Sequence, residues 1–239
     1  MDHFYEAKKE MILSKTATQT NQNILDAGCG RGNYIQSLSP RTFAVGIDLD
    51  KRKINSAMRG RMDDNSHYAV ADAAHLPLRD SIFGGVLCLD VLHMPDNYEL
   101  IVREMLRCLG CDGSLVLAIL NDNFPPFDLH NLKAWINRKR NRPVRFTWQA
   151  YDYEPRLFDR KRVIKLLEEN RVGVVNIYFF GVVFAFMADY FCYVVHRFFR
   201  VTDDKLLPIA KAGIALDMKM GNWSNASQVV LEIKQVRAC

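Results

Sequence analysis

The sequence has no internal repeat and no low-complexity segment, so repeat architectures and long disordered tracts are not expected. Its first fifteen residues contain no continuous apolar run, which argues against a secretory signal and predicts a cytoplasmic protein. The one C-x-x-C motif, Cys108 to Cys111, lacks a second pair and a histidine at ligand spacing, so we predict no metal site. The six cysteines are scattered through apolar runs and loops, and we expect reduced thiols.

The composition is that of one globular domain. The chain has 239 residues, of which 49% are hydrophobic and 25% charged, enough for one full core and too few for two comfortable ones. We therefore predict a single domain over residues 1–239. The formal net charge of +5 suits phosphate-bearing partners or anionic surfaces, but it is also common among ordinary enzymes.

Short apolar runs alternate with longer mixed segments, which is the pattern of a parallel sheet with crossover helices. The predicted strands are residues 23–27, 43–48, 67–71, 85–89, 114–120, 172–179 and 228–236. Helical composition or spacing marks residues 33–38, 51–59, 98–109 and 159–170. The sequence therefore predicts an α/β fold.

A glycine loop follows the first predicted strand. In LDAGCGRGNY, Gly28, Gly30 and Gly32 alternate with other residues, and such a strand–loop–helix allows a ligand to approach the bare backbone. The spacing is not the dinucleotide pattern G-x-G-x-x-G, because Asn33 stands where its last glycine would fall. A nucleotide-like ligand other than NAD is indicated.

The acids near this loop favour a positively charged ligand. Asp26 lies just ahead of the glycines, where a carboxylate would repel a pyrophosphate and attract a cation such as the sulfonium and ammonium of S-adenosylmethionine. Asp48 ends the next apolar run, at the position of a ribose acceptor. The alternative is that Asp48 or Asp50 caps the helix predicted at 51–59.

Five segments together resemble the successive motifs of class I S-adenosylmethionine-dependent methyltransferases, particularly the small-molecule branch related to ubiquinone-biosynthesis enzymes. They are LDAGCGRG (25–32), GIDLD (46–50), VADAAHLPL (70–78), SIFGGVLCLDVLHMPD (81–96) and REMLRCLGCDGSLVLAIL (103–120). The resemblance implies a Rossmann-like sheet of seven mostly parallel strands with helices on both faces and an antiparallel last strand. It also implies a cofactor-binding core over 23–120, with looser similarity at 158–181 and 228–237.

The resemblance assigns the cofactor contacts residue by residue. The methionine portion of S-adenosylmethionine would lie against Asp26 and the Gly28–Cys29–Gly30 backbone, and the ribose against Asp48. Leu49 would form an apolar wall for adenine. The adenine amino group would donate to Asp72, and the Ala73 amide would donate to a ring nitrogen. For Asp72, an ordinary acid at a strand end remains the alternative.

The fourth strand would bring Leu89 beside the sulfonium, and His93 after it stands where the family often has a histidine. His93 would serve as a general base, or it would only pack locally. The chain departs from the family at Cys111–Gly113, which replaces the usual P-G-G turn before the fifth strand. Aspartate and glycine still suit a turn there.

Two segments bear on the methyl acceptor. The basic insertion, residues 121–151, carries Lys133, Arg138, Lys139, Arg140, Arg142 and Arg145, which suits a solvated loop, an anionic substrate or membrane surface, or RNA. Residues 152–237 hold the C-terminal helices, the last two strands and an aromatic segment at 172–200. This aromatic segment indicates a core strand with a packed helix, or a lipophilic acceptor pocket or membrane-edge contact, in preference to a membrane span.

A helix over 183–199 would place Phe184, Met187, Phe191, Val195 and Phe198 on one stripe that can face the sheet. Phe186, Tyr190, Tyr193 and Phe199 would lie elsewhere around it, lining an acceptor pocket or resting on a bilayer.

Three functions follow as hypotheses. The first is methyl transfer by in-line displacement to a small, lipophilic or biosynthetic acceptor, with peripheral contact to the inner membrane surface. The second is an RNA methyltransferase that uses the basic insertion, although nucleic acid is the less favoured partner. The third is a regulatory or scaffold subunit that binds S-adenosylmethionine without catalysis.

Overall fold

The computed structural model describes residues 3–16, 22–38, 40–92, 97–120, 160–170, 172–180, 202–221 and 228–235, together with residues 184, 187, 188, 191, 192, 195 and 198. The chain divides into two compact units. One comprises Met1–Glu10, Leu120–Arg160 and Tyr178–Val229, and the other comprises Met11–Ile119, Lys161–Ile177 and Val230–Cys239. The single domain expected over residues 1–239 stays a prediction.

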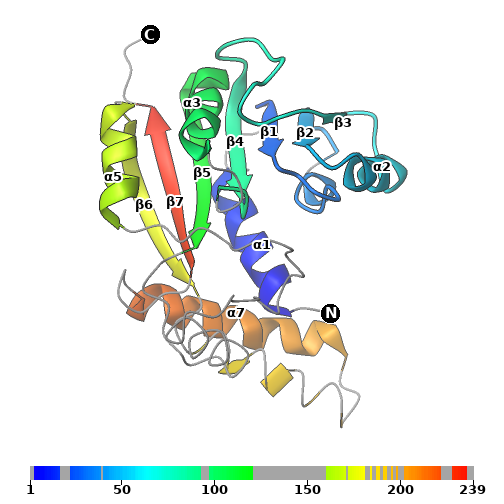
Figure 1. The fold of residues 1–239 in the computed structure, drawn as a ribbon. Coiled ribbons are helices and arrows are strands. Elements are labelled where there is room, and N and C mark those ends of the chain that lie inside the picture. The colour runs from blue at the N-terminus through cyan, green and yellow to red at the C-terminus, as the bar shows by residue number, and fades with distance from the viewer. Residues whose placement is uncertain are drawn as a thin grey trace, which may run out of the picture. The chain divides into compact units, whose positions relative to one another are not determined.

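A seven-stranded sheet is the centre of the fold (Figure 1). Its strands are β1 (Ile24–Ala27), β2 (Ala44–Asp48), β3 (Ser66–Val70), β4 (Phe83–Leu89), β5 (Leu109–Leu120), β6 (Val172–Phe180) and β7 (Gln228–Gln235), in the order β3-β2-β1-β4-β5-β7-β6. Strands β1 to β5 pair in parallel, whereas the β7 arrow in Figure 1 points opposite to those of β5 and β6. The predicted α/β fold, mostly parallel with an antiparallel last strand, is confirmed.

The central strands are apolar because both of their faces are covered. All four residues of β1 are buried, as are six of the seven residues of β4. In this setting a buried carboxylate is unusual, and Asp26 in β1 is only 2% exposed.

Three helices form close to their predicted positions. They are α2 (Lys51–Arg59), α3 (Tyr98–Cys108) and α5 (Arg160–Glu169), and α2 contacts β2 and β3. The apolar stripe of α3 buries Ile101, Val102, Met105, Leu106 and Cys108. In place of the helix expected at 33–38, only a short 3₁₀ helix forms at Ile35–Ser37.

The start of β5 differs from the prediction. Helix α3 ends at Cys108, and the chain enters the sheet at once, since Leu109 is fully buried and pairs with Phe83. The segment Cys111–Gly113 therefore lies inside β5, where the pairing register shifts, and it does not form a turn before the strand. Burial of Leu109 outweighs the turn preference of Asp112 and Gly113.

One expectation for the cysteines is wrong. Cys29, Cys88, Cys108 and Cys192 are free and buried, but Cys111 is disulfide-bonded, with its partner outside the described residues. The bond does not close the C-x-x-C motif, because Cys108 is free. The scattered spacing of the cysteines therefore did not reveal this disulfide.

The sequence did not predict two helices. One is α7 (Asp203–Met220), in the unit that contains Tyr178–Val229, and the other is α1 (His3–Thr16), whose residues are divided between the two units. Pro208 inside α7 interrupts the helical signal. The fully buried Asp217 of α7 accepts a hydrogen bond from the Phe184 amide at 2.9 Å, and the Cys192 thiol donates to the Leu206 carbonyl at 3.5 Å.

The aromatic segment packs differently from the prediction. Of the stripe expected to face the sheet, Met187, Phe191 and Phe198 are 63%, 52% and 73% exposed, and Phe184 and Val195 are partly buried. Among the described positions of the segment, Cys192 is buried. Three of the five side chains of the predicted stripe are therefore accessible. No helix within the described ranges is long and apolar enough to cross a bilayer.

Candidate cofactor-binding site

Four acids meet at one edge of the sheet. Asp26 lies near the end of β1, Asp48 ends β2, Asp72 comes two residues after β3, and Asp90 follows β4. These strands are neighbours and run in parallel, so their carboxyl ends share one edge, where open α/β sheets bind ligands. The edge is strongly acidic and therefore suits a cationic ligand.

The glycine loop leaves β1 in an unusual conformation. Gly28, Gly30 and Gly32 have φ angles of +83°, +56° and +79°, which L side chains rarely adopt. The amides of Gly28 and Cys29 both donate to the Ile47 carbonyl at 2.8 Å, which holds the loop against β2.

The three glycines have different surroundings. A side-chain carbon at Gly28 would lie 2.1 Å from Cγ2 of Val91, and one at Gly32 would lie 2.8 Å from the Tyr68 ring. At Gly30 nothing lies within 4 Å. Bare backbone at Gly28 and Gly32 thus makes room for the protein's own side chains, and only Gly30 leaves open space for a ligand.

Asp48 ties the glycine loop to the end of β2. Its Oδ2 accepts from the Gly30 amide at 2.9 Å, and its Oδ1 accepts from the Asp50 amide at 2.8 Å. The cap of α2 is Asp50, whose carboxylate accepts from the Arg52 amide at 2.8 Å. Of the two alternatives for a helix cap, Asp50 takes that role, and Asp48 is directed to the loop.

Asp26 is a buried carboxylate close to a second negative charge, that of Asp48. Its Oδ2 is buried without a hydrogen-bond partner, although buried carboxylates are normally paired. Burial, and secondarily the negative charge of Asp48, raises the pKa of Asp26 from 3.8 to about 7. Burial and the same two carboxylates also raise the pKa of the Cys29 thiol, so Cys29 stays protonated. A nearby positive charge would favour the ionised form of this carboxylate.

Asp72 lies half-exposed at the start of the β3–β4 loop. Its Oδ1 accepts from the Ala74 amide at 2.9 Å, and its Oδ2 lies 3.5 Å from Nδ1 of His75. This side-chain turn fixes the carboxylate relative to the backbone of Ala73.

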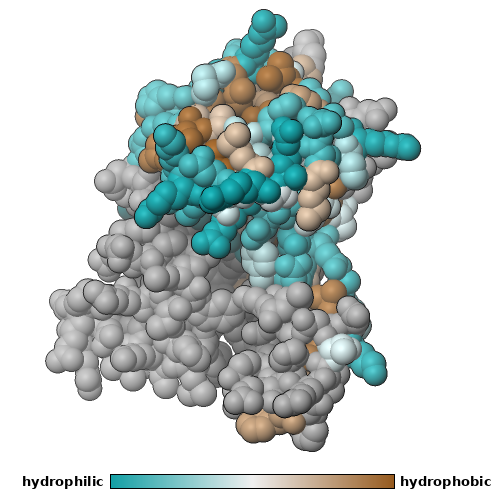
Figure 2. Space-filling view, turned by 90° about the vertical axis from the view of Figure 1, so that its right-hand side faces the viewer, coloured by the Kyte–Doolittle hydropathy of each residue, from teal (hydrophilic) through white to brown (hydrophobic). Residues whose placement is uncertain are grey.

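Two apolar residues complete the described edge. Leu49 is 73% exposed beside Asp48, whereas Leu89 is buried at the end of β4. Figure 2 shows the face that carries α2 and β3, where polar side chains surround separate apolar areas. His93 and the basic insertion at 121–151 lie outside the described residues. No group of histidine, cysteine or acidic side chains in the described part of the chain could hold a metal ion.

Sequence reasoning missed two residues that shape this edge. Val91 occupies the space beside Gly28, and Tyr68 the space beside Gly32. Val91 lies between Leu89 and His93, at the end of the fourth strand, and this place near the ligand was the available signal, although it did not reveal the contact with Gly28. Tyr68 carries no such signal in the sequence.

The chain is similar in sequence to known methyltransferases. Residues 25–117 match a family described as a methyltransferase domain. The methyltransferase GfsG of Streptomyces halstedii is 30% identical over 121 residues, which cover 47% of this chain and 43% of that protein. A ubiquinone biosynthesis O-methyltransferase of Chromobacterium violaceum is 31% identical over 120 residues, covering 47% and 50%. A tRNA (carboxymethyluridine(34)-5-O)-methyltransferase of Arabidopsis thaliana is 29% identical over 99 residues, covering 40% and 23%.

Among solved structures, the geranyl diphosphate C-methyltransferase of Streptomyces coelicolor A3(2), in complex with Mg²⁺, geranyl diphosphate and S-adenosyl-L-homocysteine, has the same fold. The TM-score is 0.63 at 17% identity, over 97% of this chain and 81% of that one. The chain spans half or less of the length of the curated relatives named above. Residues 25–117 therefore match a methyltransferase domain, and the sheet has the fold seen in S-adenosylmethionine-dependent methyltransferases of class I.

Proposed function

We propose that this protein transfers the methyl group of S-adenosylmethionine to a small, lipophilic or biosynthetic acceptor. The observation that carries the proposal is the unpartnered, buried carboxylate of Asp26 beside the open backbone at Gly30. A cofactor with a sulfonium and an ammonium supplies the missing positive charge.

The cofactor contacts are part of the same proposal. Asp26 and the Gly28–Cys29–Gly30 backbone hold the methionine portion, and Asp48 accepts from the ribose hydroxyls with the lone pairs that Gly30 and Asp50 leave free. The exposed Leu49 covers one face of adenine. Asp72 and the Ala73 amide meet its edge, and Leu89 lies beside the sulfonium.

The chain's own residues act mainly by binding and orientation. When bound, the cofactor would supply an electrophilic methyl group: the acceptor would bond to the methyl carbon in line as the carbon–sulfur bond breaks, and the sulfur would take the bonding electrons and become neutral. Asp26 and Asp48 orient the cofactor, and the buried ends of β1 and β4 keep water from one side of it. His93 as a general base stays a prediction, needed for a hydroxyl or carbon acceptor and dispensable for an amine.

A lipophilic acceptor is favoured by the aromatic segment. Met187, Phe191 and Phe198 expose apolar surface that a water-soluble acceptor would not need. Such side chains suit a long-chain acceptor, or a membrane surface that delivers one to a cytoplasmic enzyme at the inner face of the bilayer. A solved methyltransferase of the same fold is in complex with geranyl diphosphate, which supports a lipophilic acceptor.

An RNA acceptor is the second candidate. It is favoured by the excess of lysine and arginine in the basic insertion and by the similarity to a tRNA methyltransferase over 40% of the chain. A regulatory subunit that only binds the cofactor is the third, since binding needs the same residues as catalysis.

Labelled S-adenosylmethionine separates the three candidates. The purified protein is incubated with lipid extract, total RNA and a protein pool, and the label is followed into each. Label in the lipid fraction supports the proposal, whereas label in RNA, falling steeply as salt is raised, supports the second candidate. Cofactor binding without transfer to any pool indicates the third. Failure to bind the cofactor at all contradicts the whole proposal.

Asp48→Ala is expected to weaken binding of S-adenosylhomocysteine by about 1 to 3 kcal/mol, because hydrogen bonds to an ionised acceptor are lost. The variant also releases the Gly30 amide, so the loop loses its tie to β2. Titration calorimetry measures the change. Asp50→Ala is the matched control, because it removes the cap of α2 at about 1 kcal/mol of stability and leaves Asp48 in place. Equal affinities for Asp48→Ala and the wild type would reject the ribose assignment.

A further inference from the structure

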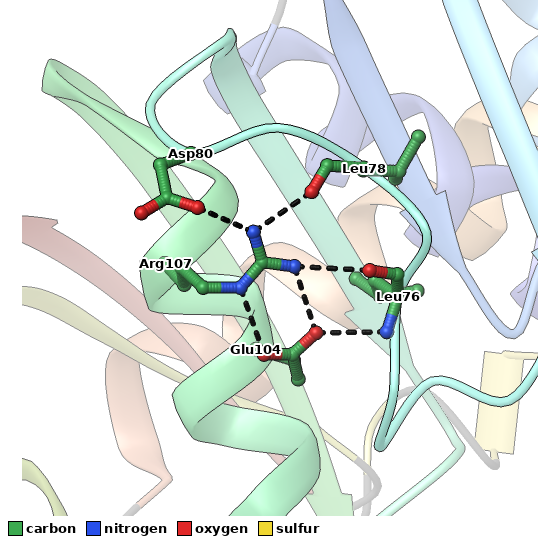
Figure 3. A network of polar contacts seen from close by, with 5 residues as sticks. All are labelled: Leu76, Leu78, Asp80, Glu104 and Arg107. Atoms are coloured by element: carbon green, nitrogen blue, oxygen red, sulfur yellow. Dashed lines mark hydrogen bonds and ion pairs between the residues drawn. The ribbon is translucent and has the colours of Figure 1, made fainter.

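Arg107 of α3 binds the loop between β3 and β4. The polar cluster around it comprises Leu76, Leu78, Asp80, Glu104 and Arg107 (Figure 3). Its Nη1 donates to the Leu78 carbonyl at 2.8 Å and to Asp80 at 2.6 Å. Its Nη2 donates to the Leu76 carbonyl at 3.1 Å and to Glu104 at 2.8 Å, and its Nε donates to Glu104 at 2.8 Å. All five N–H groups of the guanidinium are therefore used.

Glu104 accepts hydrogen bonds both from Arg107 and from the backbone of the β3–β4 loop. One of its oxygens accepts from the Leu76 amide at 2.8 Å, so both polar groups of the Leu76 backbone are bound from α3. The hydrogen bonds from Arg107 hold the pKa of Glu104 below its ordinary value, which keeps the carboxylate ionised. The Arg107 and Glu104 side chains are only 29% and 21% exposed, so water competes little for these bonds.

The bound backbone leads directly to Asp72. After Asp72, the Ala74 amide donates to the Asp72 carboxylate at 2.9 Å and the His75 amide donates to the Asp72 backbone carbonyl at 3.0 Å. The next amide, that of Leu76, donates to Glu104. Three consecutive amides thus have fixed acceptors. The position of the Asp72 carboxylate relative to the sheet is set at one end by β3 and at the other by the Arg107 cluster.

We infer that Arg107 is a positioning residue for purine recognition, which fixes Asp72 and the Ala73 amide so that the protein prefers adenine to hypoxanthine. The inference rests on the proposed cofactor site. Adenine presents an amino donor and a ring-nitrogen acceptor, which match a carboxylate and an amide N–H. Hypoxanthine presents an oxo acceptor and a ring N–H donor, so both contacts become repulsive. That discrimination requires both groups to be held in place.

Binding of S-adenosylhomocysteine and S-inosylhomocysteine, measured by calorimetry on the full chain, tests the inference. We expect the wild type to prefer the adenosyl compound by roughly 100-fold, because two contacts reverse their sign. Arg107→Lys keeps the charge but cannot reproduce the planar fork, and the preference should fall about tenfold. Arg103→Lys, the same exchange at an exposed position of α3, should leave the preference unchanged.

The ratio of the two affinities distinguishes positioning from general stabilisation. A merely structural Arg107 would lower the melting temperature and leave the ratio at its wild-type value, and that result would overturn the inference. If Arg107→Lys does not fold, Asp80→Ala removes one acceptor of Arg107 and leaves the bonds to Glu104 intact. A lower ratio in this variant supports the inference, and an unchanged ratio overturns it. A wild type that binds neither compound contradicts the proposed function itself.

Discussion

Gly28→Ala is expected to destabilise the protein by about 2 to 5 kcal/mol. A φ of +83° costs an L residue about 1 to 2 kcal/mol, and a methyl group 2.1 Å from Val91 adds an overpacking cost of about 1 to 3 kcal/mol. Because the loop must move to relieve the contact, cofactor affinity should fall as well. Thermal unfolding with and without S-adenosylhomocysteine measures both effects.

Gly30→Ala is the matched control for this prediction. It introduces the same methyl group at a φ of +56°, where nothing lies within 4 Å, so only the backbone cost of about 1 to 2 kcal/mol is expected. Adding Val91→Ala to Gly28→Ala should recover part of the lost stability, since the clash partner is removed. Equal destabilisation by the two glycine variants would show that packing against Val91 is not what Gly28 provides.

Asp26 is expected to make the cofactor-free protein less stable as the pH rises from about 4 to about 7. Below pH 3.8 the carboxyl is protonated in both the unfolded and folded states, and burial carries no charge penalty. Between 3.8 and about 7 the unfolded state loses its proton first, so folding increasingly requires proton uptake. Above about 7 the folded protein holds a buried, unpaired charge, at a cost on the order of a few kcal/mol.

Asp26→Asn removes this titration. Its unfolding free energy should change less than that of the wild type between pH 5 and pH 8, which chemical denaturation at the two values measures. Under the proposed function, affinity for S-adenosylmethionine should rise through pH 7 in the wild type, because the cation favours the ionised carboxylate, and stay flatter in Asp26→Asn. Parallel pH profiles of stability for the two proteins would contradict the raised pKa.

The strands could be predicted because their signal is local. The apolar runs of the central strands need no partner to be recognised, and all seven predicted strands form, most with ends within one or two residues of the expected ones. The exception is β5, whose start depends on Leu109 pairing with Phe83, a contact that no local pattern contains. Helix α7 was missed because Pro208 lies inside it, and a proline within a segment argues against a helix there.

The sequence by itself determined that acids and a glycine loop follow parallel strands, and hence that they meet at one edge of the sheet. Only the tertiary structure decided what each one does there. Val91 and Tyr68 fill the space at Gly28 and Gly32, Asp48 binds the loop while Asp50 caps α2, and Arg107 holds the backbone near Asp72. These contacts join residues that are distant along the chain, and they depend on side-chain packing and hydrogen-bond geometry, which exist only once the sheet has formed.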